Sequence, residues 1–380
     1  MYYRQFGRSC RKVSALGFGA MRLPTVDGDV SRIDEPEATR MIRAAIDGGV
    51  NYVDTAYPYH GGNSELFLSR ALADGYRERV TLVTKMPTWL IESEADFDRY
   101  LNEQLGKLRT NHLEFYLLHS LNDQIWPKLK ALNVLAWGER AVASGRIGGM
   151  GFSFHDGAPV FIDIVNDYDK WALAQVQYNY MDAFSQAGTA GVRYAAERGI
   201  PLVVMEPLRG GQLARKPPQV VQEVWSTAPV QRTLADWALQ WLWDQPEVSV
   251  VLSGMSTMEQ VDENLASANR SRVGALTDDE HGLIERVREA FMARRGVPCT
   301  GCGYCLPCPN GVHIPEVFMF YNDALVYDDL PRASMSYRWV EEENRASRCT
   351  RCGHCEPLCP QHIAIPDLLA EAEKLLTAKA

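Results

Sequence analysis

Short apolar runs alternate with longer amphipathic segments over residues 1–295. The runs are rich in β-branched and aliphatic residues, a pattern typical of parallel strands joined by helical crossovers. Strands are predicted at residues 15–18, 52–54, 80–84, 115–118, 147–151, 173–176, 202–204 and 248–252. The alternation therefore predicts an α/β fold built from eight strand–helix units.

The segments between these strands carry helical periodicity. In residues 36–47 the apolar side chains share one face, and Gly48-Gly49 supplies a stop. Further helices are predicted at residues 93–108, 127–144, 157–168, 186–198, 230–243 and 257–268. Eight units over roughly 250 residues favour a closed (β/α)8 TIM barrel. An open doubly wound sheet is the alternative, but no G-x-G-x-x-G motif follows the first strand.

Ionisable residues close three consecutive predicted strands. Asp54 ends the second strand, Lys85 ends the third and His119 ends the fourth, while Tyr59 lies in the loop after Asp54. Each residue alone has an ordinary structural explanation, as a turn cap, a solvated charge or a core histidine. Catalytic groups of such barrels collect where strands lead into helices, so the joint placement indicates an active site.

The stretch NYVDTAYPYHGGNSE resembles the signature of the aldo/keto reductase family. Asp54, Tyr59, Lys85 and His119 match the catalytic Asp, Tyr, Lys and His of that family in order and in approximate spacing. The resemblance covers roughly residues 1–292. It implies a TIM barrel, an N-terminal hairpin that closes the bottom of the barrel, and an enzyme that interconverts a carbonyl and an alcohol with NADP(H) or NAD(H).

The resemblance also implies a role for each of the four residues. Hydride addition builds negative charge on the carbonyl oxygen, so a proton must arrive as that charge develops. Tyr59 would supply the proton, and Lys85 would be the cation that makes proton exchange feasible near neutral pH. Asp54 would hold Lys85, and His119 would donate a hydrogen bond to the carbonyl oxygen or assist proton transfer.

Cofactor contacts are implied at the ends of several strands. They fall on Gly19, Met21, Ser153, Gln175, Met205, Glu206, Leu208, Gly210, Gly254, Met255, Ser256, Gln260, Glu263 and Asn264. Met205 stands where the family usually has an aromatic residue, and Phe154 stands where it has Asn. Gly254 and Gln260 replace the usual Lys and Arg that grip the 2′-phosphate, so the phosphate form of the cofactor stays open.

The cysteines divide the chain. Eight of the nine lie between Cys299 and Cys359, and Cys10 stands apart. Gly296 and Pro298 stop a helix just before the first cysteine, so we predict a barrel domain over 1–295 and a second domain over 296–380.

The eight cysteines form two motifs of ferredoxin type. Cys299, Cys302, Cys305 and Cys308 read C-x2-C-x2-C-x2-C-P, and Cys349, Cys352, Cys355 and Cys359 read C-x2-C-x2-C-x3-C-P. The second spacing is usual for bacterial ferredoxins, and together the motifs predict two [4Fe-4S] clusters. A zinc site or disulfides are the alternatives, but zinc usually takes paired C-x2-C knuckles and disulfides need an oxidising compartment.

The two motifs are parts of an internal repeat. CPNGVHIP after the first parallels CPQHIAIP after the second, and each is followed by a predicted helix. The pseudo-symmetric module resembles the α-helical ferredoxin domains of larger oxidoreductases. That resemblance implies that one cluster is held by Cys299, Cys302, Cys305 and Cys359, and the other by Cys349, Cys352, Cys355 and Cys308.

Composition narrows the classes of function. Hydrophobic residues make up 46% and charged residues 23% of the chain, so a folded protein is expected. The net charge of −9 disfavours a nucleic-acid partner. No apolar run approaches the length of a membrane span, and no signal peptide is evident, so a cytoplasmic protein without a membrane partner is expected.

These features together predict an iron–sulfur oxidoreductase that exchanges electrons between a small carbonyl or alcohol and a one-electron carrier protein. A hydride carries two electrons whereas a cluster carries one, so a flavin, a radical step or a substrate that takes single electrons is required for the two sites to communicate. The alternatives are an electron-transfer subunit whose barrel only docks a partner, and an iron–sulfur or zinc redox sensor. The sequence leaves the substrate, the oligomeric state and the physiological direction open.

Overall fold

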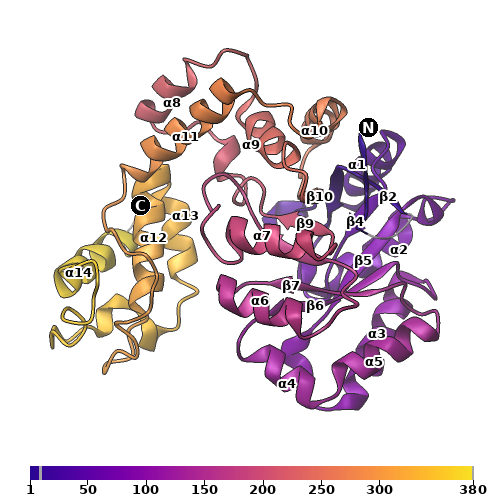
Figure 1. Ribbon diagram of the computed structural model, residues 1–380, viewed down its shortest axis with the longest axis horizontal. Helices are drawn as coiled ribbons and strands as arrows, with labels where there is room; N and C mark the ends of the chain where they lie inside the picture. The colour runs from indigo at the N-terminus through magenta and orange to yellow at the C-terminus, as the bar shows by residue number, and fades with distance from the viewer. Residues whose placement is uncertain (8–10, 379–380) are drawn as a thin grey trace. The chain divides into compact units, whose positions relative to one another are not determined.

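The computed structural model describes residues 1–7 and 11–378, so the lone Cys10 lies outside the described residues (Figure 1). The chain forms two compact units. The first comprises Met1–Ala214 and Arg232–Thr277, and the second comprises Arg215–Gln231 and Asp278–Ala380.

The first unit contains a closed barrel of parallel strands. In order around the barrel they are β3 (Leu16–Gly19), β4 (Tyr52–Asp54), β5 (Thr81–Met86), β6 (Phe115–Leu121), β7 (Met150–Phe154), β8 (Ala174–Gln177), β9 (Leu202–Met205) and β10 (Val248–Ser253). β10 pairs with β3 in parallel, which closes the ring. The predicted TIM barrel is confirmed, and the open doubly wound sheet is excluded.

Several strands extend beyond their predicted ends. β5 runs to Met86 and β6 to Leu121, beyond the predicted ends at residues 84 and 118, so Lys85 and His119 lie near the ends of their strands, as expected. β7 begins at Met150, three residues later than predicted, and Ile147 forms only an isolated bridge to Leu113. Polar side chains at these ends hid the extra ladder positions from a reading of apolar runs alone.

Helices follow the strands and surround the barrel. They are α1 (Glu35–Asp47), α2 (Ser64–Ala71), α3 (Glu94–Leu108), α4 (Ile125–Ala131), α5 (Val134–Ala143), α6 (Ala158–Asn166), α7 (Gly188–Glu197), α9 (Leu234–Trp243) and α10 (Met258–Arg270). The single helix predicted at 127–144 is wrong, because Asn133 adopts a left-handed conformation with φ of 61° and separates α4 from α5. α2 was not predicted, since eight residues show the helical period poorly.

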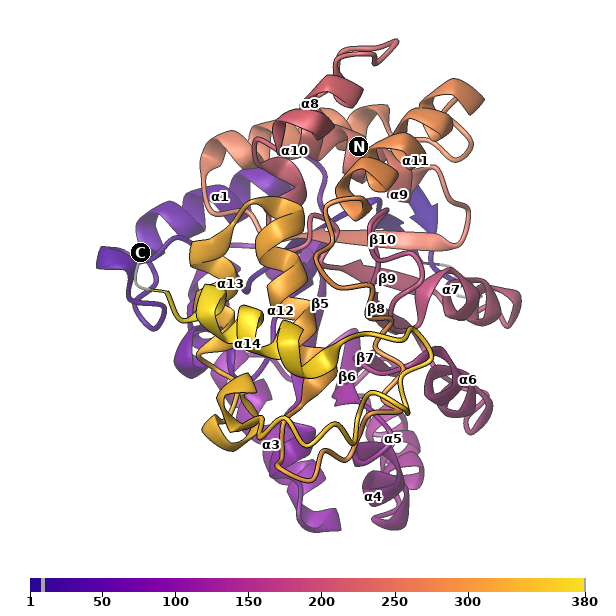
Figure 2. The same cartoon turned by 90° about the vertical axis from the view of Figure 1, so that its left-hand side faces the viewer.

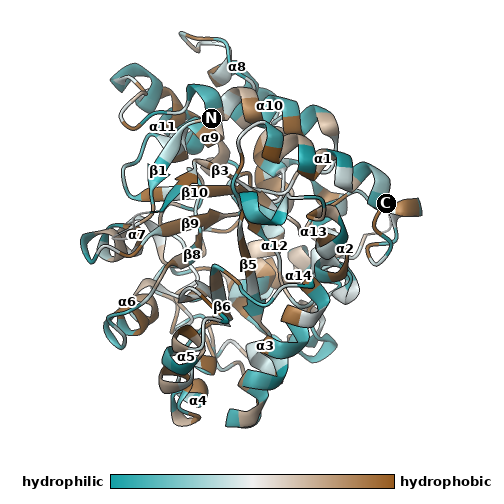
Figure 3. Ribbon diagram, turned by 90° about the vertical axis from the view of Figure 1, so that its right-hand side faces the viewer, coloured by the Kyte–Doolittle hydropathy of each residue, from teal (hydrophilic) through white to brown (hydrophobic). Residues whose placement is uncertain are grey.

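The barrel interior is filled at its N-terminal end by the hairpin of β1 (Tyr3–Gln5) and β2 (Lys12–Ser14). Phe6, just after β1, has its ring centroid 5.1 Å from that of Phe115 and 6.1 Å from that of Tyr52. Figure 3 shows β9 and β10 coloured largely as hydrophobic and the surrounding helices as mixed, with hydrophilic stretches. The hairpin closes one end of the barrel as predicted, which leaves the opposite end for a site.

The second unit is helical. It comprises α8 (Gln219–Trp225), α11 (Asp278–Met292), α12 (Ile314–Tyr327), α13 (Leu330–Tyr337) and α14 (Ile365–Leu376). α12, α13 and α14 pack against one another around buried side chains such as Phe318 and Leu369 (Figure 2). α12 and α14 each follow a cysteine motif and carry Pro in the first turn, which agrees with the sequence repeat.

Packing divides the chain before the predicted boundary near residue 295, since α11 packs with α8 and α12 in the second unit. The domain boundary between residues 295 and 296 stays a prediction. Within the part of the chain that the structure describes, no helix is both long and apolar enough to cross a bilayer.

Candidate functional site

Three of the four predicted catalytic residues lie at the C-terminal ends of adjacent strands. Asp54 is the last residue of β4, Lys85 precedes the last residue of β5, and His119 lies near the end of β6. Tyr59 opens a short 3-10 turn, Tyr59–Gly62, in the loop after β4. The strands are parallel and adjacent, so their ends gather these side chains at the barrel mouth.

Lys85 hydrogen-bonds to both Asp54 and Tyr59. Its Nζ donates to Asp54 Oδ1 at 2.6 Å and to the Thr55 carbonyl oxygen at 2.8 Å. It also donates to the Tyr59 hydroxyl at 3.4 Å. Both charged side chains are buried, with residue exposures of 1% for Lys85 and 3% for Asp54. The buried ion pair with Asp54 therefore places the Lys85 ammonium group next to the Tyr59 hydroxyl.

The electrostatics keep Lys85 charged and Tyr59 protonated. Burial acts to lower the pKa of Lys85, but the Asp54 carboxylate and the Tyr59 phenol together outweigh burial and raise it. The pKa of Tyr59 is also raised, because burial outweighs the opposing effect of the Lys85 cation. Tyr59 is therefore a neutral phenol with a proton to give at neutral pH, next to the cation that would stabilise its phenolate.

His119 is a neutral imidazole. Burial, together with the positive charge of Lys85, lowers its pKa to about 2. Its Nδ1 is buried and has no hydrogen-bond partner among the described residues. Its ring lies across from two aromatic rings, 6.3 Å from that of Tyr59 and 5.2 Å from that of Trp89. Trp89 is 45% exposed, and no sequence motif pointed to it as a wall of the mouth.

Ser153 and Gln175, the predicted carboxamide contacts, are side by side. They are register partners on β7 and β8, and each is 1% exposed. The Ser153 hydroxyl accepts a hydrogen bond from the Ser120 amide at 2.8 Å, and Gln175 Nε2 contacts the Met205 sulfur at 3.8 Å. Gln175 Oε1 is buried without a partner among the described residues, so it is an acceptor that an incoming amide donor would satisfy.

The other predicted cofactor residues divide into three groups. Gly19 and Met21 lie at the end of β3, while Glu206, Leu208 and Gly210 follow β9. The last group follows β10 and continues onto α10: Gly254, Met255, Ser256, Gln260, Glu263 and Asn264.

Several polar residues of the β10 group already have hydrogen-bond partners near by. The Ser256 amide donates to Gln260 Oε1 at 2.8 Å. Asn264 Nδ2 donates to the Ser253 hydroxyl at 2.8 Å. Glu263 differs, because its carboxylate accepts a hydrogen bond from Thr233, the residue that caps α9. Its carboxylate is therefore already engaged with the neighbouring helix.

Arg22 is a residue of the mouth that the sequence analysis missed. Its Nη2 lies 3.0 Å from Glu206 Oε1, and its carbonyl oxygen accepts from the Ser256 hydroxyl at 2.6 Å. It therefore touches two of the predicted cofactor residues. The contacts join segments more than 180 positions apart, and a lone Arg in a loop gave no signal of them.

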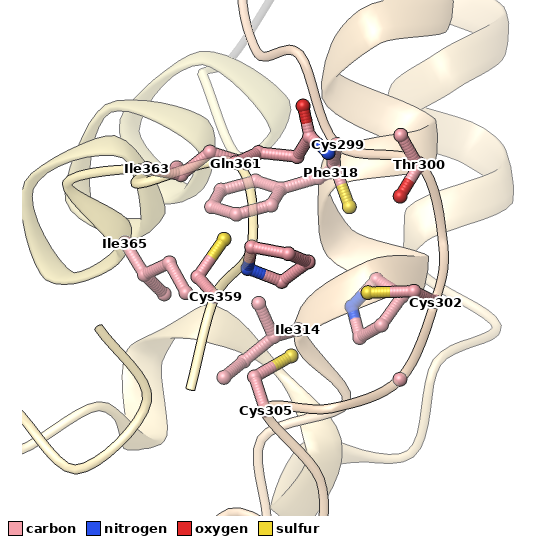
Figure 4. Close-up of a pocket in the computed structure, with 13 residues that line it drawn as sticks. Cys299, Thr300, Cys302, Cys305, Ile314, Phe318, Cys359, Gln361, Ile363 and Ile365 are labelled. Carbon is pink, nitrogen blue, oxygen red and sulfur yellow. The ribbon is translucent and has the colours of Figure 1, made fainter. Parts of the chain in front are cut away.

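In the second unit, cysteines from both motifs meet at one pocket. Cys299, Cys302 and Cys305 of the first motif line it together with Cys359 from the end of the second. Figure 4 shows the four sulfur atoms turned toward a shared space. This is the set of four that the resemblance to α-helical ferredoxin domains implied for one cluster.

The surroundings of this pocket suit a cluster. Apolar side chains, among them Ile314, Phe318, Ile363 and Ile365, form its wall, so a cluster there would be partly shielded from water, with Cys302 on its exposed side. Gly301 and Gly303 between the cysteines have φ of 73° and 75°. This left-handed backbone lets successive cysteines curl around one centre.

The second motif is linked to the first by Asn310, which lies two residues after Cys308. Asn310 Nδ2 donates to the Thr350 hydroxyl at 2.9 Å and contacts the Cys352 sulfur at 3.9 Å. In the repeat, Thr350 corresponds to Thr300, and Gln361 corresponds to Asn310. Gln361 lines the first pocket. Each half thus sends the segment after its last cysteine to the other half's motif.

The family model of the aldo/keto reductases matches residues 15–289. The chain belongs to the aldo/keto reductase family. A second model, the 4Fe-4S dicluster domain, matches residues 298–364. This aldo/keto reductase therefore carries an iron–sulfur module beyond the oxidoreductase barrel, as the cysteine spacing predicted.

Relatives of this aldo/keto reductase cover its barrel part. L-galactose dehydrogenase of Arabidopsis thaliana is 25% identical, over 75% of this chain and 94% of its own length. Among solved structures, the holo form of the aldo-keto reductase AKR11C1 from Bacillus halodurans has a TM-score of 0.62 at 27% identity, covering 76% of this chain and 96% of its own. An aldo/keto reductase from Klebsiella pneumoniae in complex with NADP and acetate has a TM-score of 0.60 at 25% identity, covering 74% of this chain and 94% of its own.

Proposed function

We propose that this aldo/keto reductase interconverts a small carbonyl compound and its alcohol with a nicotinamide cofactor, and that electrons pass through two [4Fe-4S] clusters. The observation that carries the first part is the buried Lys85–Asp54 ion pair, whose ammonium lies 3.4 Å from the Tyr59 hydroxyl at the barrel mouth. This is an acid with an adjacent stabilising cation, which is what carbonyl reduction needs.

The side chains divide the work of proton transfer. The bound nicotinamide would supply the hydride. Tyr59 gives its hydroxyl proton to the substrate oxygen, and the Lys85 ammonium stabilises the phenolate that remains. Asp54 keeps Lys85 in place and charged. Neutral His119 donates a hydrogen bond to the same oxygen, because one of its ring nitrogens carries a proton at neutral pH.

The low pKa of His119 leads to a test by pH. The imidazole is already neutral throughout the ordinary range, so carbonyl reduction should show no histidine ionisation between about pH 5 and pH 9. The profile of kcat against pH measures this. A break of the profile near the ordinary histidine pKa that disappears in His119→Gln would contradict the neutral assignment.

The nicotinamide assignment is supported by the groups on β7 and β8. A carboxamide has both donor and acceptor atoms, and the unpartnered Gln175 Oε1 next to the Ser153 hydroxyl can pair with them. Met205 lies beside Gln175, and its thioether can pack on a flat ring where the family usually has an aromatic residue. The Klebsiella relative, with NADP bound, supports the same class of cofactor.

Selection between NADPH and NADH is expected to be weak. Gly254 and Gln260 offer no charge at the two positions where cationic side chains usually grip the 2′-phosphate. Each charge-assisted contact is worth about 1.5–3 kcal/mol, so we expect the two affinities to agree within about a hundredfold. Titration of both reduced cofactors into one anaerobic preparation at matched salt measures this. A thousandfold preference for NADPH would show that other residues grip the phosphate.

The second half of the proposal rests on the cysteine module. One cluster would be held by Cys299, Cys302, Cys305 and Cys359, and the other by Cys349, Cys352, Cys355 and Cys308. Bound clusters would supply one-electron steps. Cys302 and Cys352 are exposed, so each proposed cluster has an edge near the surface. That position suits exchange with an external one-electron carrier protein.

Coupling between the two sites needs a change of electron number. Hydride chemistry moves an electron pair, whereas each cluster accepts a single electron. A flavin, a radical step or a substrate able to take single electrons could connect two-electron and one-electron chemistry. The cofactors released from anaerobically purified protein test the first: bound flavin supports it, and the absence of flavin in active protein leaves the radical step or the substrate.

A further inference from the structure

Arg22 contacts three of the predicted cofactor residues, Glu206, Gly254 and Ser256, without being one of them. Its guanidinium forms an ion pair with Glu206 after β9, and its carbonyl is bound by Ser256 after β10. Its side chain is 41% exposed and that of Glu206 is 29% exposed. Ion pairs of this exposure contribute little to stability, so a ligand can replace one partner at low cost.

The stem of Arg22 lies against Gly254. A Cβ atom at position 254 would be 3.2 Å from Cβ, Cγ and Cδ of Arg22, closer than such contacts usually are. The space where the family commonly has a lysine side chain is therefore partly taken by an arginine from another loop. Glycine at position 254, where the family usually has a cation, therefore leaves room for the side chain of Arg22.

Other arginines that might have reached a phosphate are engaged elsewhere. Arg209 pairs with Asp182 at 3.2 Å, and Arg270 pairs with the buried Asp236 at 2.8 Å. Arg215 belongs to the second unit, where it pairs with Asp329. Removing Arg270 from its partner would leave a buried carboxylate without its cation, which is costly. The cost is smaller for Arg22, because the side chain of its partner Glu206 is 29% exposed.

Glu206 places a carboxylate among the residues predicted to contact the cofactor. It is a predicted cofactor contact with a negative charge, and a carboxylate facing a phosphate is repulsive. It also has φ of 54°, a left-handed conformation that is uncommon outside glycine and asparagine. The position of Arg22 over Glu206 neutralises that carboxylate and presents remaining guanidinium donors to an incoming anion.

We infer that Arg22 binds a phosphate of the dinucleotide cofactor, either the pyrophosphate or the 2′-phosphate, and that Glu206 competes with this phosphate for the guanidinium. Arg22 would thus set cofactor affinity in place of the cations missing at Gly254 and Gln260. The inference rests on the nicotinamide part of the proposed function. It adds a specificity residue that no position of the family motif supplies.

The experiment is a fluorescence titration of NADPH and NADH into the anaerobic full-length protein and four variants. Arg22→Ala should weaken binding about ten- to hundredfold, through loss of a charge-assisted contact. Arg22→Lys should fall in between, since it keeps the charge but loses the planar fork. Glu206→Gln should tighten binding, because the competitor is neutralised. Arg32→Ala is the matched control, as Arg32 is an exposed arginine of the same loop paired with Asp27.

The two cofactors separate the sources of the anion. An equal loss for NADPH and NADH in Arg22→Ala assigns the contact to the pyrophosphate, and a loss confined to NADPH assigns it to the 2′-phosphate. A change below threefold for both cofactors, with the parent binding them normally, overturns the inference and leaves the proposed function standing. A parent protein that binds neither cofactor overturns both.

Discussion

Tyr59→Phe should lower carbonyl reduction by about a hundredfold or more, because the variant keeps the ring and loses only the proton donor. Cofactor affinity should stay almost unchanged, since the hydrogen bond of the hydroxyl within the described residues is to Lys85, a residue outside the predicted cofactor contacts. The measurement is kcat with a series of simple aldehydes, alongside cofactor titration. A loss in kcat at constant cofactor affinity identifies a group that acts in the transition state.

Tyr57→Phe is the control for this experiment. Tyr57 lies two residues away, stacks edge-on against Tyr100 and has Lys107 over its ring, away from the Lys85 pair. Its activity should remain within a factor of two of the parent. If Tyr59→Phe behaves the same way, the four-residue match does not describe the chemistry. The barrel would then be better explained as a docking domain for an electron-transfer partner.

The second large effect concerns metal content. Anaerobic protein should hold about eight iron and eight acid-labile sulfide per chain, from two four-iron clusters. Cys359→Ser should lose about half of each, because it removes the fourth thiol of the pocket shared with Cys299, Cys302 and Cys305. Cys10→Ser, which changes the cysteine outside both motifs, should keep the full content.

Iron and sulfide assays, with electron paramagnetic resonance of the reduced protein, measure both numbers. Stoichiometric zinc without sulfide would refute the cluster assignment. Full iron content in Cys359→Ser would refute the proposed crossing of ligands between the repeats. Cys308→Ser should remove the other cluster, and so its spectrum should be the complement of that of Cys359→Ser.

The barrel could be predicted from the sequence because strand and helix patterns alternate strictly, and buried parallel strands read as apolar runs. The ends of the strands could not, since polar functional residues such as Lys85 and His119 interrupt the apolar pattern while they continue the backbone ladder. The break at Asn133 was also hidden, because left-handed conformation is a property of one residue and leaves the surrounding helical period intact.

The candidate site divides in the same way. Asp54, Tyr59, Lys85 and His119 could be found because local motifs and strand order place them together. The contacts of Arg22 and the hydrogen bond from Thr233 to Glu263 depend on the packing of segments that are distant in sequence. A sequence carries no local trace of such contacts. The glycine at position 254 also gave no sign in the sequence that the Arg22 side chain packs beside it.

The pocket that joins Cys359 to the first cysteine motif has a consequence for folding. A cluster bound there would act as a covalent staple that closes the whole stretch from Cys299 to Cys359 into a ring. Closing a long loop removes much conformational freedom from the unfolded chain, so the staple would favour the folded module strongly. Oxidative loss of this cluster would remove one of the two links between the repeats, while a cluster held by Cys349, Cys352, Cys355 and Cys308 would still join them.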